Sequence, residues 1–327
     1  MRRSSAGLLL ATLTLAGCDG TATPPTHWLE LTDQSGAYSA AITSGGRYVL
    51  VGAVTHGGSL WELNSEARLY DWNHQPGVFS VLAAVDFSPD GRYALTATPQ
   101  DLVVWSVDSG RAEGFWSSPG EILAAELSRD GAFALLGLAN HEAIYFDVRQ
   151  GGIRTSLRHP ARVRSVALSG DEHRALTGAD DYTARLWDLD SGQVLQQVTL
   201  GNTVDTVALS PDGRMAFSSA SLDQALVWDT TSGEALFHLS GNERLFPRKL
   251  SYLSARFSDN GDRLLVGRTD GTVELWDVNR GERIRQWQGH KRSAFGPTST
   301  GIIALAFAAD GNGWLAAGSN GVINWLR

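Results

Sequence analysis

One short phrase recurs seven times along the 327 residues, and this repetition constrains the fold more than any single residue does. Its clearest copy runs from Ser210-Pro211-Asp212-Gly213-Arg214 to Leu226-Val227-Trp228-Asp229. A turn residue opens each copy, at Gly46, Gly91, Gly131, Glu172, Gly213, Gly261 and Gly311. An aromatic follows 14 or 15 residues later, at Trp61, Trp105, Phe146, Trp187, Trp228, Trp276 and Trp325. The steps between these aromatics are 44, 41, 41, 41, 48 and 49 residues, a period typical of repeated sheets rather than helical repeats.

One repeat contains four short segments that each favour a strand. Residues 204–209 are apolar at nearly every other position, and Pro211-Asp212-Gly213 then supplies the backbone preferences of a tight turn. Two further apolar segments and a more polar one follow before the next copy begins. A four-stranded sheet of this kind leaves both faces uncovered, so the copies must stack around an axis. The sequence therefore predicts an all-β, seven-bladed propeller of four-stranded antiparallel blades.

The last copy stops at Trp325-Leu326-Arg327, directly after its third strand. His27-Trp28-Leu29-Glu30-Leu31 has the alternation of a strand and is the candidate for the missing fourth one. Pairing the two chain ends would hide two sheet edges that otherwise invite aggregation. We expect the ring to close in this way.

The copies resemble the WD-repeat family of β-propellers. The resemblance is carried by Trp187-Asp188, Trp228-Asp229 and Trp276-Asp277, and it covers residues 27–327. The Gly-His pair of that family occurs once, as Gly289-His290, so most blades are expected to lack the family's complete polar network. The resemblance implies a fold that presents surfaces to protein partners.

The N-terminal residues differ from the repeats and resemble a bacterial lipoprotein signal. Arg2 and Arg3 precede a short apolar run, and Leu15-Ala16-Gly17-Cys18 matches the lipoprotein cleavage box. The predicted organisation is a signal peptide over 1–17, a tether over 18–26 and a propeller over 27–327. Cys18, the only cysteine, is the predicted site of lipid attachment.

Composition and charge bear on location and partners. Without Arg2 and Arg3 the formal charge becomes −10, since 25 basic residues then face 35 acidic ones. An acidic body argues against general nucleic-acid binding. The expected location is the periplasmic side of a cell membrane, held by lipid, and Asp19 favours the inner membrane over the outer.

The sequence contains no pattern that favours catalysis, a cofactor or a metal site. The glycines belong to turns, no His-Glu-x-x-His occurs, and no Gly-x-Ser-x-Gly surrounds any serine. Asp101 and Asp180-Asp181 are interpreted as turn residues rather than acid–base pairs. The chain is therefore expected not to be an enzyme, although a fold alone does not exclude catalysis.

Two long insertions, residues 241–252 and 289–300, follow the fourth strands of the fifth and sixth copies and should emerge on the same face. Basic and aromatic residues dominate protein interfaces, which makes these loops the candidate partner-binding site. The candidate residues are Arg244, Phe246, Arg248, Lys249, Tyr252, Lys291, Arg292 and Phe295. A smaller insertion, residues 75–79, belongs to the same face.

The predicted function is a non-catalytic protein-interaction scaffold, anchored by lipid and facing partners in the cell envelope. Two alternatives remain open at this stage. One is an assembly factor of the outer-membrane protein machinery. The other is a propeller that binds a glycan or another small ligand on its aromatic loops.

Overall fold

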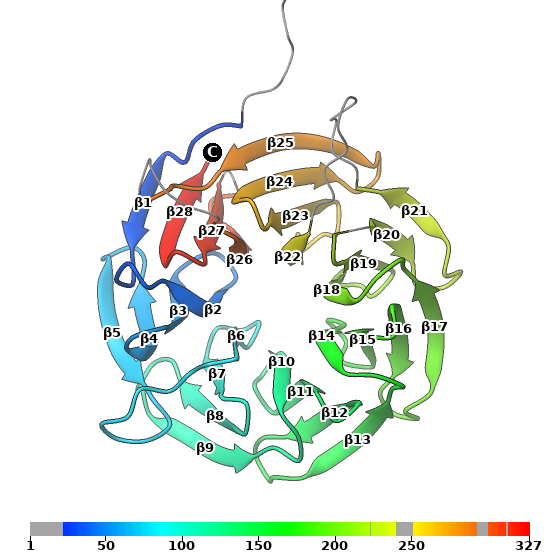
Figure 1. Cartoon of the computed structure of the whole chain (residues 1–327), viewed down its shortest axis with the longest axis horizontal. Coiled ribbons are helices and arrows are strands. Elements are labelled where there is room, and N and C mark those ends of the chain that lie inside the picture. The colour runs from blue at the N-terminus through cyan, green and yellow to red at the C-terminus, as the bar shows by residue number, and fades with distance from the viewer. Residues whose placement is uncertain (1–21, 223, 240–250, 293–299, 312) are drawn as a thin grey trace, which may run out of the picture.

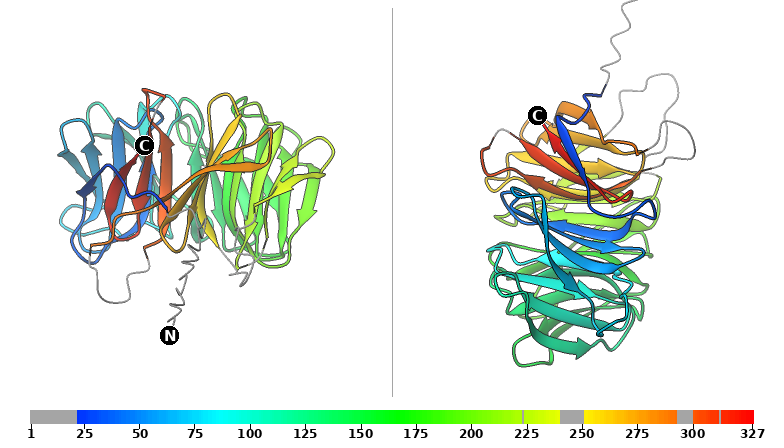
Figure 2. Two further views of the ribbon diagram at one scale, coloured as in Figure 1. Left: turned by 90° about the horizontal axis from the view of Figure 1, so that it is seen from above. Right: turned by 90° about the vertical axis from the view of Figure 1, so that its left-hand side faces the viewer.

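The computed structural model describes residues 22–222, 224–239, 251–292, 300–311 and 313–327. These residues form 28 strands and no helix, arranged as seven four-stranded antiparallel sheets around a central channel (Figure 1). Seen edge-on, the sheets form a short ring with two distinct faces (Figure 2). The predicted all-β, seven-bladed architecture is confirmed.

Six of the seven blades use four consecutive strands, ordered from the channel outward. Blade 1 comprises β2 (Ala37–Ile42), β3 (Tyr48–Ala53), β4 (Gly57–Glu62) and β5 (Ala67–Trp72). Blade 2 comprises β6 (Ala84–Phe87), β7 (Tyr93–Ala97), β8 (Asp101–Ser106) and β9 (Ala112–Ser117). Blade 3 comprises β10 (Ile122–Leu127), β11 (Phe133–Leu138), β12 (Glu142–Asp147) and β13 (Ile153–Arg158). Blade 4 comprises β14 (Val163–Leu168), β15 (Arg174–Ala179), β16 (Thr183–Asp188) and β17 (Val194–Thr199).

The remaining three blades follow the same order, and the last one is completed by the N-terminus. Blade 5 comprises β18 (Val204–Leu209), β19 (Met215–Ala220), β20 (Ala225–Asp229) and β21 (Ala235–His238). Blade 6 comprises β22 (Tyr252–Phe257), β23 (Arg263–Arg268), β24 (Thr272–Asp277) and β25 (Glu282–Gln288). Blade 7 comprises β26 (Ile302–Phe307), β27 (Trp314–Gly318), β28 (Val322–Leu326) and β1 (His27–Glu30).

The hydrophobic core lies between the blades rather than at the centre of the ring. Strands such as β11 are buried along nearly their whole length, because a neighbouring blade covers each face. The buried side chains of the described residues form seven clusters, and each cluster joins two adjacent blades. No blade could bury these apolar surfaces alone, so stacking and closure stabilise every sheet at once.

The ring closes where the two chain ends meet, as the sequence predicts. β1 pairs antiparallel with β28, and His27 lies opposite Trp325. Before β1, the chain also binds the outer edge of blade 6. The Thr23 N–H donates to the Gln286 carbonyl, and the Gln288 N–H donates to the Thr23 carbonyl, each at 3.0 Å. The N-terminal segment therefore completes blade 7 and also binds blade 6. We call this region, where the two chain ends meet, the seam.

Polar side chains inside two blades form networks that the sequence analysis missed. In blade 4, the Trp187 indole N–H donates to the Thr177 hydroxyl at 2.8 Å, and the His159 ring lies 5.0 Å from the Trp187 ring. In blade 2, Thr96 accepts from the Trp105 indole at 2.8 Å and pairs with His74 Nε2 at 2.9 Å. Neither histidine follows a glycine, which is why the search for a Gly-His pair did not find them.

Candidate functional site

The two faces of the ring carry different structures. One face holds the connections from each outermost strand to the next innermost strand, together with the turns between second and third strands; we call it the loop face. The opposite face, the turn face, holds the Ser-Pro-Asp-Gly turns and their equivalents. In these turns the aspartate accepts backbone and side-chain hydrogen bonds, as Asp212 does from Ser210 and Arg214. The turn face is thus built mainly from residues that satisfy one another.

Large apolar side chains are exposed on the loop face but not on the turn face, within the described part of the chain. The loop-face residues are Tyr38, Val78, Phe79, Val81, Tyr182, Leu222 and Leu253. The other exposed large apolar residues lie on the outermost strands, around the perimeter: Trp28, Leu69, Phe115, Ile153, Val194, Leu195, Leu236 and Ile284. Exposed apolar side chains that gather on one face are typical of an interaction surface.

The connection between β5 and β6 is the most exposed apolar part of the loop face. Val78, Phe79 and Val81 are 55%, 64% and 55% exposed. The loop is nevertheless fixed at its base, since the His74 N–H donates to the Ser80 hydroxyl and the Ser80 N–H donates to the Asn73 side chain. This smaller insertion therefore holds three apolar side chains in water on a well-bonded support.

The first long insertion lies mostly outside the described residues, including Arg244, Phe246, Arg248 and Lys249. Its last residue, Tyr252, begins β22 and is only 2% exposed. The ring packs edge-on against Phe217 at 5.9 Å, and burial beside Glu274 raises the pKa of its hydroxyl. Tyr252 is therefore a core residue, and the expectation that it lines an exposed aromatic patch is corrected here. The first residues of the other inner strands are also apolar and buried, and aligning the repeats at that position would have indicated this.

The second long insertion begins by packing on the seam. The His290 ring stacks on Trp28, with centroids 4.0 Å apart and planes at 8°. Arg292 donates to the Thr32 carbonyl at 2.5 Å and lies 3.7 Å from the Glu30 carboxylate, with 14% of its side chain exposed. Lys291 points into solvent, and Phe295 lies outside the described residues. Of the two basic candidate residues that the structure describes, Lys291 and Arg292, only Lys291 is exposed and available to a partner.

The aspartates weighed as acid–base pairs are occupied by structural contacts. Asp180 accepts from Arg162 and Arg164 at 2.8 and 2.7 Å. Burial acts to raise the pKa of Asp180, but these two arginines outweigh it and lower the pKa overall. Asp181 accepts from Thr183 and Arg185, and Asp101 accepts from Ser117.

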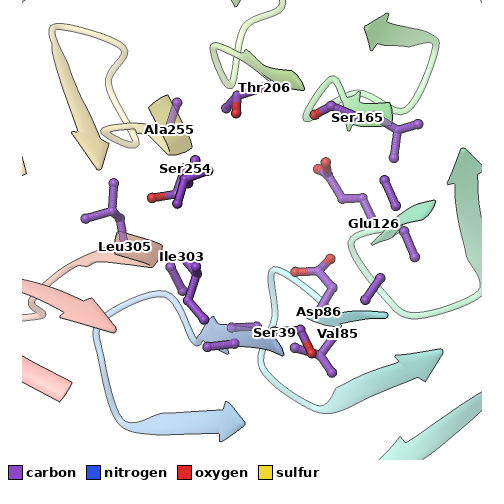
Figure 3. A pocket seen from close by; sticks show the side chains of 18 of the residues that line it. Ser39, Val85, Asp86, Glu126, Ser165, Thr206, Ser254, Ala255, Ile303 and Leu305 are labelled. Carbon is purple, nitrogen blue, oxygen red and sulfur yellow. The ribbon is translucent and has the colours of Figure 1, made fainter. Parts of the chain in front are cut away.

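The central channel is a cavity of about 400 Å³ lined by the innermost strands. Figure 3 shows Asp86 on β6 and Glu126 on β10 pointing into it from adjacent blades. Arg256 on β22 in blade 6 also lines the channel, opposite the two carboxyl groups, and donates to the Ile42 carbonyl at 3.2 Å. No group of three or more His, Cys, Asp or Glu side chains among the described residues is arranged to hold a metal ion.

This geometry defines a closed seven-bladed β-propeller with an exposed apolar loop face and a charged channel. The family described as "WD domain, G-beta repeat" matches residues 152–188 and 249–277. The match covers two of the seven repeats. Together with the seven-bladed fold and with third strands that end in Trp-Asp or a related pair, it supports a WD-repeat β-propeller. A search of curated proteins returned no match. Within the described ranges, no helix has the length and hydropathy needed to cross a membrane.

Proposed function

We propose that this protein is a lipid-anchored, non-catalytic scaffold that binds protein partners through its loop face, on the periplasmic side of a bacterial membrane. WD-repeat propellers commonly serve as protein-interaction scaffolds. The observation that carries the proposal for this chain is the one-sided distribution of exposed apolar side chains, above all Val78, Phe79 and Val81.

The proposed mechanism is presentation of a preformed surface. The loop between β5 and β6 is hydrogen-bonded at its base, and the blades beneath it are held by continuous packing. A partner that binds such a surface loses little of its binding free energy to ordering the scaffold. Lys291 adds a positive charge to the same face, and the basic residues of the first insertion would extend it.

The proposed anchor is a lipid on Cys18, and the described N-terminus supports a location for it. Residues 19–22 separate Cys18 from Thr23, and even fully extended that length spans no more than about 18 Å. Thr23 is hydrogen-bonded to blade 6 beside the seam. A lipid on Cys18 would therefore hold the seam close to the bilayer surface and concentrate the ring near membrane partners. Asp19 favours the inner membrane over the outer.

Capture from detergent-solubilised membranes tests partner binding. The double variant Val78→Ser/Phe79→Ser should lose the partners that the wild-type chain retains. The matched control is Val194→Ser/Leu195→Ser, because those two residues are similarly exposed on the outermost strand of blade 4. Equal capture by both variants would reject the loop-face site, and the identity of the captured proteins would decide whether barrel-assembly components are among them.

A second variant tests the basic insertions, namely Arg244→Glu, Arg248→Glu and Lys291→Glu together. Reduced capture is expected if the insertions extend the site.

Anchoring is tested separately by mass spectrometry of the mature N-terminus and by Cys18→Ser. We expect this change to release the protein from the membrane fraction without altering its melting temperature.

A glycan or small-ligand function would need aromatic platforms at the surface. Tyr252 was one of three candidates for that role, and its burial removes it. The exposed apolar residues of the β5–β6 loop are instead of the kind that anchor protein interfaces.

A further inference from the structure

The channel wall contains two carboxyl groups at a position where four of the other five blades have alanine. Asp86 and Glu126 occupy the fifth position of the innermost strand in blades 2 and 3, counted by alignment of the repeats. Blades 1, 4, 5 and 7 have Ala41, Ala167, Ala208 and Ala306 there. Only blade 6 has another charged residue at this level, Arg256.

Each carboxyl group also ties its blade to the next one. Asp86 Oδ2 accepts from the Leu127 N–H of blade 3 at 2.8 Å. The backbone N–H of Leu168 in blade 4 lies near Glu126 and favours its ionised form. Three successive blades therefore meet at these two side chains, so their charge state affects the contacts between blades.

The other charged groups near the channel do not neutralise the pair directly. Arg164 on β14 is engaged with Asp180 at 2.7 Å, and Asp205 on β18 accepts from Ser221. Arg256 attracts both carboxylates from across the channel but hydrogen-bonds to Ile42. Strands β2, β3, β7 and β11, which pack against β6 and β10, contain no charged residue. No Lys, Arg or His nitrogen of the described chain forms an ion pair within 4 Å of Asp86 or Glu126.

We propose that Asp86 and Glu126 share one proton in the channel and act as a pH-responsive link between blades 2, 3 and 4. Both side chains point into the channel from adjacent blades (Figure 3), so two negative charges there would repel each other. One shared proton leaves the pair with a single negative charge, which Arg256 balances across the channel.

The pKa shifts of the two carboxyl groups give the direction of the effect on stability and the pH range in which it occurs. Burial raises the pKa of Asp86 to about 6, and burial together with the nearby Asp86 charge raises the pKa of Glu126 to about 8. Both values lie above those of an unfolded chain, so the folded state binds the proton more tightly. The stabilisation is complete below about pH 4 and is lost as the pH rises through about 6 and then about 8. Deprotonation at mildly alkaline pH should therefore loosen this part of the ring.

The experiment measures proton release on thermal unfolding, by calorimetry at pH 7 in two buffers with different ionisation enthalpies. The full-length wild-type chain should release about one more proton than Glu126→Gln, because the unfolded glutamate is ionised at pH 7. The control Glu121→Gln, at an exposed carboxyl just before β10, should behave like the wild type. Equal proton release by wild type and Glu126→Gln would overturn the proposal.

A second measurement covers the case in which Glu126→Gln does not fold. Carbon-13 NMR of the wild-type carboxyl groups should show Glu126 titrating near pH 8, and Asp86→Asn should lower that midpoint by removing the neighbouring charge. A Glu126 midpoint near its ordinary value, or one unaffected by Asp86→Asn, would show that the two groups do not share a proton.

Discussion

Blade 4 is built from one continuous stretch of chain, whereas blade 7 is assembled from both ends of the protein. Blade 4 contains an internal polar network in which Trp187, Thr177 and His159 lie together beneath buried strands. Blade 7 instead depends on contacts made across the seam: the β1–β28 pairing, the Trp28–His290 stack and the Arg292–Thr32 hydrogen bond.

The difference explains why part of the second insertion is not available for binding. A blade made from a continuous chain is held in register by its own short turns. The seam has no covalent turn between β28 and β1, so residues after β25 supply the missing restraint. His290 and Arg292 therefore serve closure, and the apolar β5–β6 loop is the better candidate for contact with partners.

The largest effect should come from removing the strand that closes the ring. Deleting residues 27–32 eliminates the β1–β28 ladder and the buried Leu31 side chain. Backbone hydrogen bonds at about 1 kcal/mol each and one buried leucine together predict a loss of roughly 5 kcal/mol in the free energy of unfolding. The control His27→Gln keeps the β1–β28 ladder and changes only the exposed contacts of His27 with Glu66 and Trp325. An unchanged melting temperature for the deletion would remove the basis of the comparison between blades.

Acid should destabilise blade 4 through His159. Burial, followed by the positive charge of Arg185, lowers the pKa of His159 to about 4. The unfolded chain takes up a proton near pH 6.5 and the folded chain does not, so stability is present above that pH and is lost as pH falls toward 4. The pKa difference corresponds to at most about 3 kcal/mol. Denaturation midpoints measured from pH 7 to pH 4 should fall less steeply for His159→Gln than for the wild type. Identical slopes would place the pH dependence elsewhere.

A smaller difference in the free energy of unfolding should separate the third-strand tryptophans of the two blades, Trp187 and Trp325. Trp187 is 4% exposed and bonded to Thr177, so Trp187→Phe should cost about 2 kcal/mol through a lost hydrogen bond and a small cavity. Trp325 is only partly buried, and Trp325→Phe should cost less than half as much. Urea unfolding of the two variants checks this order. A larger loss of stability for Trp325→Phe would show that Trp325 contributes more to blade 7 than Trp187 contributes to blade 4.

The smallest effect should come from Arg292. Arg292→Ala removes one charged hydrogen bond at a partly exposed site, with an expected cost of about 1 kcal/mol and no change in partner capture. Lys291→Ala, at the exposed neighbouring position, should leave stability unchanged. Lost capture at unchanged stability for Arg292→Ala would return this residue to the binding site.

Much of the fold could be predicted because every copy of the repeat places the same kinds of residue at the same spacing. Seven turns and seven aromatics at a near-constant spacing indicated seven blades, and the alternation in residues 27–31 indicated the closing strand. The candidate site was harder to predict, because the loops depart from the repeat. Tyr252 was placed on the surface from its neighbours in the chain, although its position in the strand alignment points inward.

Asp86 and Glu126 show the same limit. Their replacement of alanine at one repeat position was visible in the sequence, but that position acquires meaning only when the innermost strands face one another across the channel. Similarly, His74 and His159 reach their partners Thr96 and Trp187 only after a loop from one blade folds over the next.

The sequence by itself determined the number of blades, the strands within each blade and the pairing that closes the ring. These follow from local turn preferences and from sheets that cannot cover their own apolar faces. Only the tertiary structure decided which loop residues serve the seam and which meet solvent, and that two carboxyl groups from separate blades share one channel. Such choices depend on distances between segments far apart in the chain, which no local pattern of residues encodes.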